Sequence, residues 1–335
     1  MKLTQMMFIL IMALGTLISV SAYSWINIWI GLEMNLMAFI PLINSDNLKQ
    51  SSEVSMKYFL VQVMASMFIL FAFMYSFICL GNLDDLNPVS QFVFNSAIFM
   101  KMGAAPFHFW YPGVAEGLSW MNFLILMTWQ KIAPMILIMY NFEMNLFFCL
   151  IILISMTLSG LKGWNQTSLK KILALSSINH IGWMMAMMFL NQSLWIMYFV
   201  VYIFISTNLI LVLNKYKINT MSDLMMLYNA NKSAKFFFFM NLFSMGGIPP
   251  FLGFFPKWMV LKILIENEMY FLAFIMIFLT IFSLYIYTRL ILQPMAMKTS
   301  EKKNPFKNSS SFFIYLINWV NIIGLLLFTM MFNII

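Results

Sequence analysis

The chain of 335 residues is too apolar for a soluble protein, since 62% of its residues are hydrophobic and 9% are charged. Soluble domains carry about 25% charged residues, and a soluble fold of this length could not cover so much apolar surface. Helices are expected rather than a barrel, because the apolar runs are continuous and do not alternate with period two. The composition therefore predicts an all-α integral membrane protein and excludes a soluble enzyme.

Runs of about 20 apolar residues, the length that crosses the hydrocarbon core as a helix, follow one another almost end to end. The first run begins at Leu3 behind only Lys2 and shows no cleavage site, so we expect a first span and no cleavable presequence. The predicted single polytopic domain, 1–335, has eleven spans, at 3–21, 25–43, 56–80, 89–112, 118–140, 144–161, 169–190, 193–213, 235–265, 269–292 and 311–333.

The loop charges predict how these spans are oriented. The loops on the N-terminal side, with the adjoining span ends, hold Lys2, Lys49, Lys57, Lys162, Lys170, Lys171, Lys215, Lys217, Lys232, Lys235, Arg289, Lys298, Lys302, Lys303 and Lys307. The opposite loops hold only acids, namely Asp84, Asp85, Glu143, Glu266 and Glu268. By the positive-inside rule, the N-terminus and the basic loops face the compartment of synthesis and the C-terminus faces away. The net charge of +8 is thus a topology signal and does not indicate nucleic-acid binding.

The sequence contains no recognisable ligand set for a redox cofactor or a metal. Cys79 and Cys149 lie singly in apolar runs, and neither has a partner at metal or redox spacing. No glycine-rich phosphate loop follows a strand, no histidine pair has haem-ligand spacing, and no cysteine cluster could hold iron–sulfur. We expect two inert cysteines and no cofactor or metal in this chain.

Two spans, 89–112 and 235–265, carry Gly and Pro in their middles. They share the pattern M-G-x-x-P, at Met102, Gly103 and Pro106 and at Met245, Gly246 and Pro249. The second would be about 46 Å long as one helix, well beyond the bilayer core. We predict two broken helices, which lie five spans apart and so cross in opposite directions, as in the inverted repeats of transporters. The alternative is that Gly and Pro are simply common in membrane helices.

A few ionisable residues remain inside the spans once the loop charges are set aside. They are Glu33, Lys101, Lys131, Lys257, Lys262, His108 and His180. A charge at the bilayer centre costs about 2.5–3.5 kcal/mol on insertion scales, so such residues are functional candidates. Lys262 is the exception, because it lies near a span end, four residues before Glu266, and can snorkel or pair there.

The buried lysines are predicted to exchange protons. Burial and nearby positive charge both disfavour the charged form of a lysine, and one acid, Glu33, cannot neutralise three lysines. Lys101 and Lys257 also flank the predicted breaks, where distorted backbone can admit water. The alternative is a static role, in which each lysine pairs with Glu33 or with freed backbone carbonyls.

His180 and His108 are candidate proton relays. His180 lies in the segment SSINHIG, with Ser176 and Ser177 about one turn earlier on the same helix face. An imidazole backed by hydroxyls can pass protons through water, but it can equally make a polar contact between helices. His108 follows Pro106 in the first predicted break, and the same two interpretations apply to it.

Five segments together resemble the subunit 2 family of mitochondrial NADH:ubiquinone oxidoreductase, respiratory complex I. They are GLEMNL, KMGAAPFHFWYPG, MTWQKIAP, NQTSLKKILALSSINHIGWM and GGIPPFLGFFPKW. The resemblance runs from the first to the ninth span, and the last 40 or so residues look generic. The short N-terminus resembles the insect and other bilaterian form, which lacks the first three helices of the family's fourteen-helix antiporter-like fold.

The resemblance implies a proton-translocating core subunit of the membrane arm, in the mitochondrial inner membrane, with the basic loops in the matrix and the C-terminus in the intermembrane space. In the family, a glutamate–lysine pair, a second lysine and a lysine after the second break form the proton axis, and these match Glu33 with Lys101, Lys131 and Lys257. The implied partners are other membrane-arm and accessory subunits and phospholipids. NADH, FMN, iron–sulfur clusters and ubiquinone are expected in partner subunits.

Two other functions remain open from the sequence. A stand-alone cation/proton antiporter of the same fold would use the same lysines without a respiratory partner. A non-pumping scaffold of the membrane arm is the second, although a scaffold gains little from costly lysines at mid-membrane depth.

Overall fold

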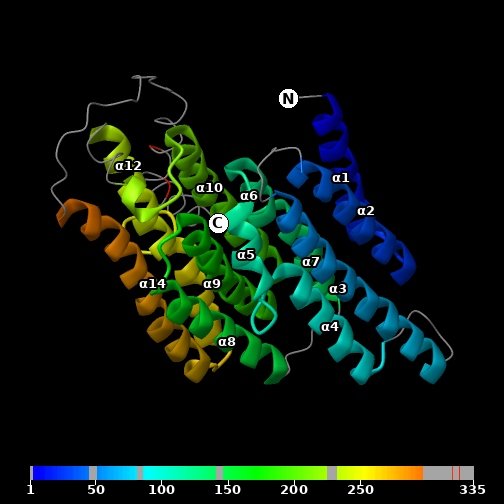
Figure 1. Ribbon diagram of the computed structural model, residues 1–335. Helices are drawn as coiled ribbons and strands as arrows, with labels where there is room; N and C mark the ends of the chain where they lie inside the picture. Colours follow the sequence, from blue (N-terminus) through cyan, green and yellow to red (C-terminus); the bar gives the residue numbers. More distant parts are fainter. Residues whose placement is uncertain are drawn as a thin grey trace. The chain divides into compact units, whose positions relative to one another are not determined.

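The computed structural model describes residues 3–44, 51–80, 86–140, 146–224 and 232–296, together with Trp319 and Gly324 (Figure 1). Within this part of the chain, 7 helices are long and apolar enough to cross a membrane. The chain divides into two compact units, Met1–Glu143 and Met144–Ile335. The protein is therefore a multi-pass helical membrane protein built from two units.

Unit 1, drawn from blue to blue-green in Figure 1, contains α1 to α7. Their bounds are α1 Leu3–Ser21, α2 Trp25–Asn44, α3 Ser51–Leu80, α4 Pro88–Met102, α5 Trp110–Gly117, α6 Trp120–Met127 and α7 Trp129–Tyr140. Neighbours in sequence pack on each other from α1 to α4, and α7 returns to contact both α1 and α4. The unit is thus closed by its last helix.

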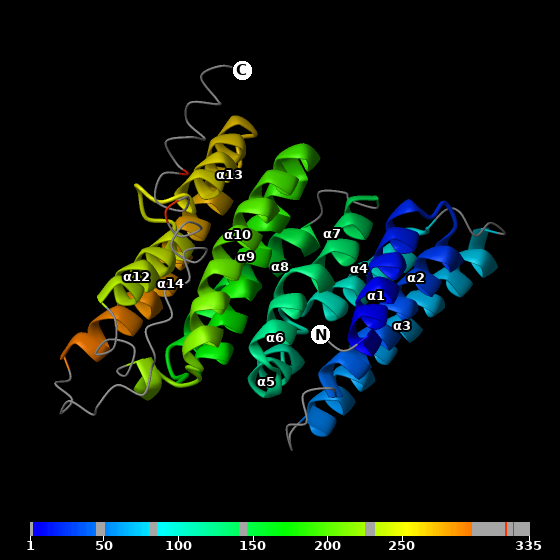
Figure 2. The same ribbon diagram turned by 90° about the horizontal axis from the view of Figure 1, so that it is seen from above.

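Unit 2, drawn from green to orange, contains α8 to α10 and α12 to α14 among its described helices (Figure 2). Their bounds are α8 Leu146–Gly163, α9 Leu169–Leu190, α10 Gln192–Tyr216, α12 Lys232–Gly246, α13 Phe254–Glu266 and α14 Tyr270–Ala296. Here α8 packs on α9, α9 on α10 and α10 on α12, and α14 returns to contact α8 and α12. The helices of unit 2 thus contact one another in the same order as those of unit 1, so the chain contains an internal structural repeat.

The all-α membrane fold with two broken helices is confirmed. Every predicted span up to residue 292 coincides with a helix or with a pair of helices, while the span predicted at 311–333 lies outside the described residues except for Trp319 and Gly324. The span predicted at 118–140 corresponds to the candidate membrane span Trp120–Tyr140, in which the helix is interrupted at the single residue Thr128, between α6 and α7. No Gly or Pro stands at Thr128 itself, and the nearest proline, Pro134, lies inside α7, so the interruption could not be located from the residue types.

The two breaks have corresponding backbone conformations, but the equivalent glycines are shifted by one residue from the alignment of the shared pattern M-G-x-x-P. The left-handed backbone that ends the first half-helix is at Gly103, with φ 73°, in unit 1 and at Gly247, with φ 79°, in unit 2. A proline, Pro106 or Pro250, stands three residues later in each. In backbone conformation Gly103 therefore corresponds to Gly247, one residue after the glycine that the shared sequence pattern aligns with it. The shared Met anchored that match, whereas the conformation is fixed by the position that only glycine adopts at low cost.

Helices α1 and α2 approach so closely that their backbones touch at two glycines. A Cβ atom added at Gly31 would lie 2.6 Å from the Ser19 amide nitrogen and 2.8 Å from the Gly15 carbonyl oxygen. Small residues at such crossings let membrane helices pack without a side chain between them. Gly31 stands two residues before Glu33, so this contact also fixes where Glu33 lies along α2.

Replacing Gly31 with valine is expected to lower the abundance of the folded protein. The added side chain cannot fit against the backbone of α1, and overpacking of this kind costs about 1–3 kcal/mol. Abundance in native gels of solubilised membranes measures the effect. Gly113→Ala is the matched control, because nothing lies within 4 Å of a Cβ added there. Equal abundance of the two variants would contradict the close packing of α1 on α2.

Candidate functional site

The structure distributes the predicted site residues between the two units. Unit 1 holds Glu33 on α2, Lys101 on α4, His108 between α4 and α5, and Lys131 on α7, whereas unit 2 holds His180 on α9 and Lys257 on α13. The three lysines are 7%, 1% and 6% exposed respectively, and both histidines are buried. Each unit therefore has its own buried lysine beside its own helix break.

Lys101 lies in the last turn of α4, immediately before the break. The helix ends there because Gly103 turns left-handed, and a Cβ at Gly103 would also lie 2.9 Å from the Tyr111 ring. The carbonyls that the break frees are not left unpaired. Trp110 Nε1 donates to the Met100 carbonyl at 3.1 Å, and Gln62 Nε2 donates to the Lys101 carbonyl at 3.2 Å. Neutral donors thus cap this half-helix, and the Lys101 ammonium is not needed for that purpose.

A small polar cavity lies beside Lys101 within unit 1. Tyr58, Gln62, Asn35 and Gln130 line it, with apolar residues of α2 and α7. Gln130 Nε2 donates to Asn35 Oδ1 at 3.0 Å, and the Tyr58 hydroxyl lies 3.4 Å from Gln130 Oε1. The cavity has room for about one water molecule. Gln130 immediately precedes Lys131 in sequence, so the cavity beside Lys101 and the second lysine lie at neighbouring positions of α7.

Glu33 and Lys101 do not form a close ion pair. Within the described residues, no carboxylate lies within 4.0 Å of the Lys101 ammonium. The Glu33 Oε1 atom is buried and has no hydrogen-bond partner in the described part of the chain. A static Glu33–Lys101 salt bridge, one of the alternatives left open by the sequence, is not seen.

Lys131 lies in the first turn of α7, just after the interruption at Thr128. Its ammonium is 5.7 Å from the centre of the Tyr111 ring, close enough for a cation–π contact. The same ring packs against Gly103 at the other break of this unit. Tyr111 thus connects the Lys131 environment to the end of α4.

His108 is buried in the segment between α4 and α5. Its Nδ1 lies 3.2 Å from the Pro106 carbonyl oxygen, and its ring stacks on Phe109 with ring centres 4.6 Å apart. These contacts hold the imidazole against the break. Its role as a relay stays a prediction.

Lys257 lies after the second break, on α13, and its side chain reaches back to α12, the helix before the break. Its ammonium donates to the Met245 carbonyl at 3.2 Å and to the Gly246 carbonyl at 2.7 Å, the last carbonyls of α12. The ammonium also lies 5.9 Å from the centre of the Trp183 ring on α9. Gly247 leaves room for this side chain, because a Cβ there would be 2.7 Å from Lys257 Cδ. The alternative that a lysine binds freed carbonyls is therefore observed at Lys257.

His180 meets a partner that the sequence did not suggest. Its Nδ1 lies 3.0 Å from the hydroxyl of Tyr198 on α10, and the Tyr202 ring is 5.1 Å away, centre to centre. Ser176 and Ser177, the hydroxyls expected to support it, donate to the Leu173 and Ala174 carbonyls of their own helix. The hydrogen bond that the structure shows for the imidazole is thus an interhelical one with a tyrosine.

Polar contacts also hold the basic end of unit 2 together. Arg289 on α14 donates to the carbonyl of Gly163, the last residue of α8, and to those of Trp164 and Gln166 just beyond it. Such contacts of a cation with terminal carbonyls stabilise helix ends. In the helical residues 221–224 after α10, burial raises the pKa of Asp223, but hydrogen bonds from Thr220 and the Asn219 amide outweigh this and hold the pKa below its usual value. At the opposite end, Lys262 pairs with Glu266 at 3.9 Å, the pairing expected from their spacing.

Uncharged residues of the site were missed by the sequence analysis. Gln62, Gln130, Asn35 and Tyr58 surround Lys101, and Tyr198 binds His180. A search restricted to charged residues and histidines passes over amides and phenols. The signal that could have found them is an amide in the middle of an apolar span, since burying an amide without a partner is also costly.

These features define a class of protein: a repeated bundle of membrane helices, with a buried lysine at the broken helix of each repeat. A family model described as NADH:quinone oxidoreductase/Mrp antiporter, TM, matches residues 22–283, more than half of the chain. The chain belongs to this family.

The similar proteins narrow the comparison. NADH-ubiquinone oxidoreductase chain 2 of Anopheles gambiae is 43% identical over 338 residues, which cover 99% of this chain and 98% of the relative. The chain 2 of Aedes aegypti is also 43% identical, over 337 residues, with the same coverage. A chain in the structure of respiratory complex I from Thermus thermophilus with bound aureothin superposes with a TM-score of 0.86 at 22% identity. That match covers 97% of this chain and 78% of the other, and shows the fold.

Proposed function

We propose that the chain is a core membrane-arm subunit of a proton-pumping NADH:ubiquinone oxidoreductase. The observation that carries this proposal is the burial of Lys101, Lys131 and Lys257 at interruptions of helices, in a chain whose near-full-length relatives are named NADH-ubiquinone oxidoreductase chain 2. The chain acts as part of an enzyme, and the reaction is driven by quinone reduction in partner subunits.

In the proposed mechanism, each lysine alternately holds and releases one proton. The ammonium is disfavoured by burial, and the described residues give neither Lys101 nor Lys257 a carboxylate within ion-pair distance. The Glu33 charge favours the protonated form of Lys101, so moving or neutralising that charge changes how tightly the proton is held. Water beside Lys101 and the Gln130 network would carry protons toward Lys131. His180 and His108 are proposed as further relay groups.

The orientation follows from the loop charges. We propose that the chain lies in the mitochondrial inner membrane, with the N-terminus and the basic loops in the matrix and the C-terminus in the intermembrane space. Other subunits of the membrane arm, accessory subunits and phospholipids would contact its apolar outer surface. NADH, FMN, iron–sulfur clusters and ubiquinone are proposed to bind partner subunits and not this chain.

Affinity purification of this chain from mitochondrial membranes tests the proposal. We expect it in a large complex that oxidises NADH, reduces ubiquinone and acidifies one side of reconstituted vesicles. The subunit separated from that complex should show no flavin, haem or iron–sulfur absorbance. The family also includes Mrp antiporters, so the rival result is a chain that purifies without NADH-oxidising partners and exchanges a cation for protons. A complex that pumps normally after loss of all three lysines would instead indicate a scaffold.

A further inference from the structure

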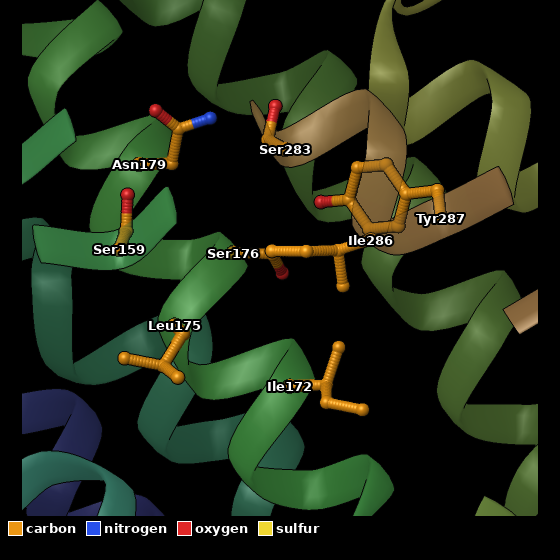
Figure 3. Close-up of a pocket in the computed structure, with 8 residues that line it drawn as sticks. All are labelled: Ser159, Ile172, Leu175, Ser176, Asn179, Ser283, Ile286 and Tyr287. Carbon is orange, nitrogen blue, oxygen red and sulfur yellow. The ribbon is translucent and has the colours of Figure 1, made fainter. Parts of the chain in front are cut away.

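A second polar cavity lies in unit 2, and one of its lining residues, Tyr287, packs against Gly246 at the end of α12. Figure 3 shows its lining, which comes from α8, α9 and α14. Five lining residues are polar and three are apolar: Ser159, Ser176, Asn179, Ser283 and Tyr287, with Ile172, Leu175 and Ile286. We call it the α8–α9–α14 cavity. Like the cavity beside Lys101, it has room for about one water molecule.

We propose that the α8–α9–α14 cavity binds a water molecule that relays protons from the basic-loop side of the membrane toward His180. The inference deepens the proposed function and rests on it, because a relay has a purpose only if this chain moves protons.

Two atoms in the cavity lack the hydrogen bonds that their burial demands. Asn179 and Tyr287 are each 2% exposed, and neither Asn179 Oδ1 nor the Tyr287 hydroxyl has a hydrogen-bond partner of suitable geometry among the described residues, although the Tyr287 hydroxyl lies close to Ser176. In Figure 3 the Tyr287 ring reaches from α14 with its hydroxyl directed toward α9. Buried polar groups in native proteins are bonded to protein or to ordered water. A water in the cavity would supply the missing hydrogen bonds to Asn179 Oδ1 and to the Tyr287 hydroxyl.

The three serines complement this water. Ser159, Ser176 and Ser283 each donate to a carbonyl of their own helix, at 2.9, 2.8 and 2.8 Å. Their hydroxyl protons are engaged, so their oxygens are left to accept. A water could then accept from Tyr287 and donate to Asn179 and to a serine, close to the average of about three hydrogen bonds for a buried water. Every lining group is neutral, which suits a water and gives no compensation for a bound ion.

The position of the cavity favours a relay rather than an isolated structural water. Ser159 is one turn before the end of α8, and Tyr287 is two residues before Arg289, which binds the carbonyls at and just beyond that end. The cavity therefore lies just beneath the basic loop between α8 and α9. Ser176 lines the cavity and stands four residues before His180, on the same face of α9. In the proposed relay, the Ser176 hydroxyl would turn from the Leu173 carbonyl to pass the proton from the water toward the imidazole.

The proposed step is a balanced proton exchange. The water receives one proton from the basic-loop side and releases one toward Ser176 and His180, so it is chemically unchanged after each transfer. Asn179 and Tyr287 are positioning residues, since they hold the water and do not themselves carry the proton.

A map of the intact wild-type complex, at a resolution that shows ordered water, is the first test. Density for a water within hydrogen-bond distance of Asn179 Oδ1 and the Tyr287 hydroxyl is expected. A dry cavity would overturn the proposal, whatever variants do.

Variants in the intact complex provide the second test. Tyr287→Phe and Asn179→Leu should each lower vesicle acidification and NADH:ubiquinone turnover several-fold, while NADH oxidation by hydrophilic acceptors is retained. Ser155→Ala is the matched control, because Ser155 is a buried serine on α8 that does not line the cavity. If water is present but the cavity variants match this control, the relay is wrong. If Lys257→Met still abolishes pumping in that case, the proposed function stands without it.

Discussion

Lys257→Met is expected to abolish proton delivery and to lower NADH:ubiquinone turnover by about 10²-fold, the lower end of what a positioned proton-transfer group contributes. The lysine is buried, so no bulk water can replace it. Methionine keeps much of its volume but has neither charge nor donors. Reconstituted vesicles that report turnover and acidification together measure the effect, and NADH oxidation by hydrophilic acceptors should be unaffected.

The two hydrogen bonds from Lys257 to α12 complicate this variant, because each charged donor bond contributes about 1.5–3 kcal/mol. Lys257→Arg separates the two roles. Arginine keeps the charge and the donors but does not release its proton, so the complex should assemble and still fail to pump. Lys262→Met is the control for loss of a lysine from the same helix, since Lys262 forms an exposed pair with Glu266. Normal acidification with Lys257→Arg would show that Lys257 acts only as a fixed charge.

Glu33→Gln is expected to lower turnover several-fold while the assembled complex keeps near-normal abundance. The structure sharpens this expectation, because Glu33 makes no close ion pair with Lys101 and its Oε1 has no hydrogen-bond partner in the described residues. Little structure is lost with the charge, but the Lys101 proton is held less firmly. Native-gel abundance measured beside NADH:ubiquinone activity tests both parts.

Glu53→Gln serves as the matched control for Glu33→Gln. Glu53 is also a carboxylate on a membrane helix, α3, but its side chain is exposed and pairs with Lys57 one turn away. Exposed pairs of this type contribute little, so turnover should stay at the wild-type level. If Glu33→Gln loses assembled complex before it loses specific activity, the role of Glu33 is structural.

The sequence predicted the fold well where the membrane imposes strong rules. Apolar length located the helices, and Gly with Pro marked both breaks, because few alternatives exist for a backbone surrounded by lipid. The sequence was a poor guide where the backbone conformation depends on a single residue. The register of the second break depends on which of Gly246 and Gly247 turns left-handed, and the interruption at Thr128 has no breaker residue.

For the site, the free energy of burying a charge was a better guide to the candidate residues than any side-chain contact expected from the sequence. The ionisable residues could be found because each is expensive to bury, and the three lysines are indeed buried. Their partners depend on tertiary packing, which spacing along one helix does not reveal. The pairing of His180 with Tyr198, and of Lys257 with the carbonyls of α12, joins different helices. The functional roles of all these residues stay predictions.

The two breaks hold the ends of their first half-helices in different ways. In the first half a neutral indole and an amide bind the freed carbonyls, so the end of α4 does not depend on the charge of Lys101. In the second half the Lys257 ammonium itself binds the last carbonyls of α12. Proton release from Lys257 would therefore loosen the joint between α12 and α13, whereas release from Lys101 would leave its joint intact. The first joint is thus independent of the charge of its lysine, and the second is sensitive to it.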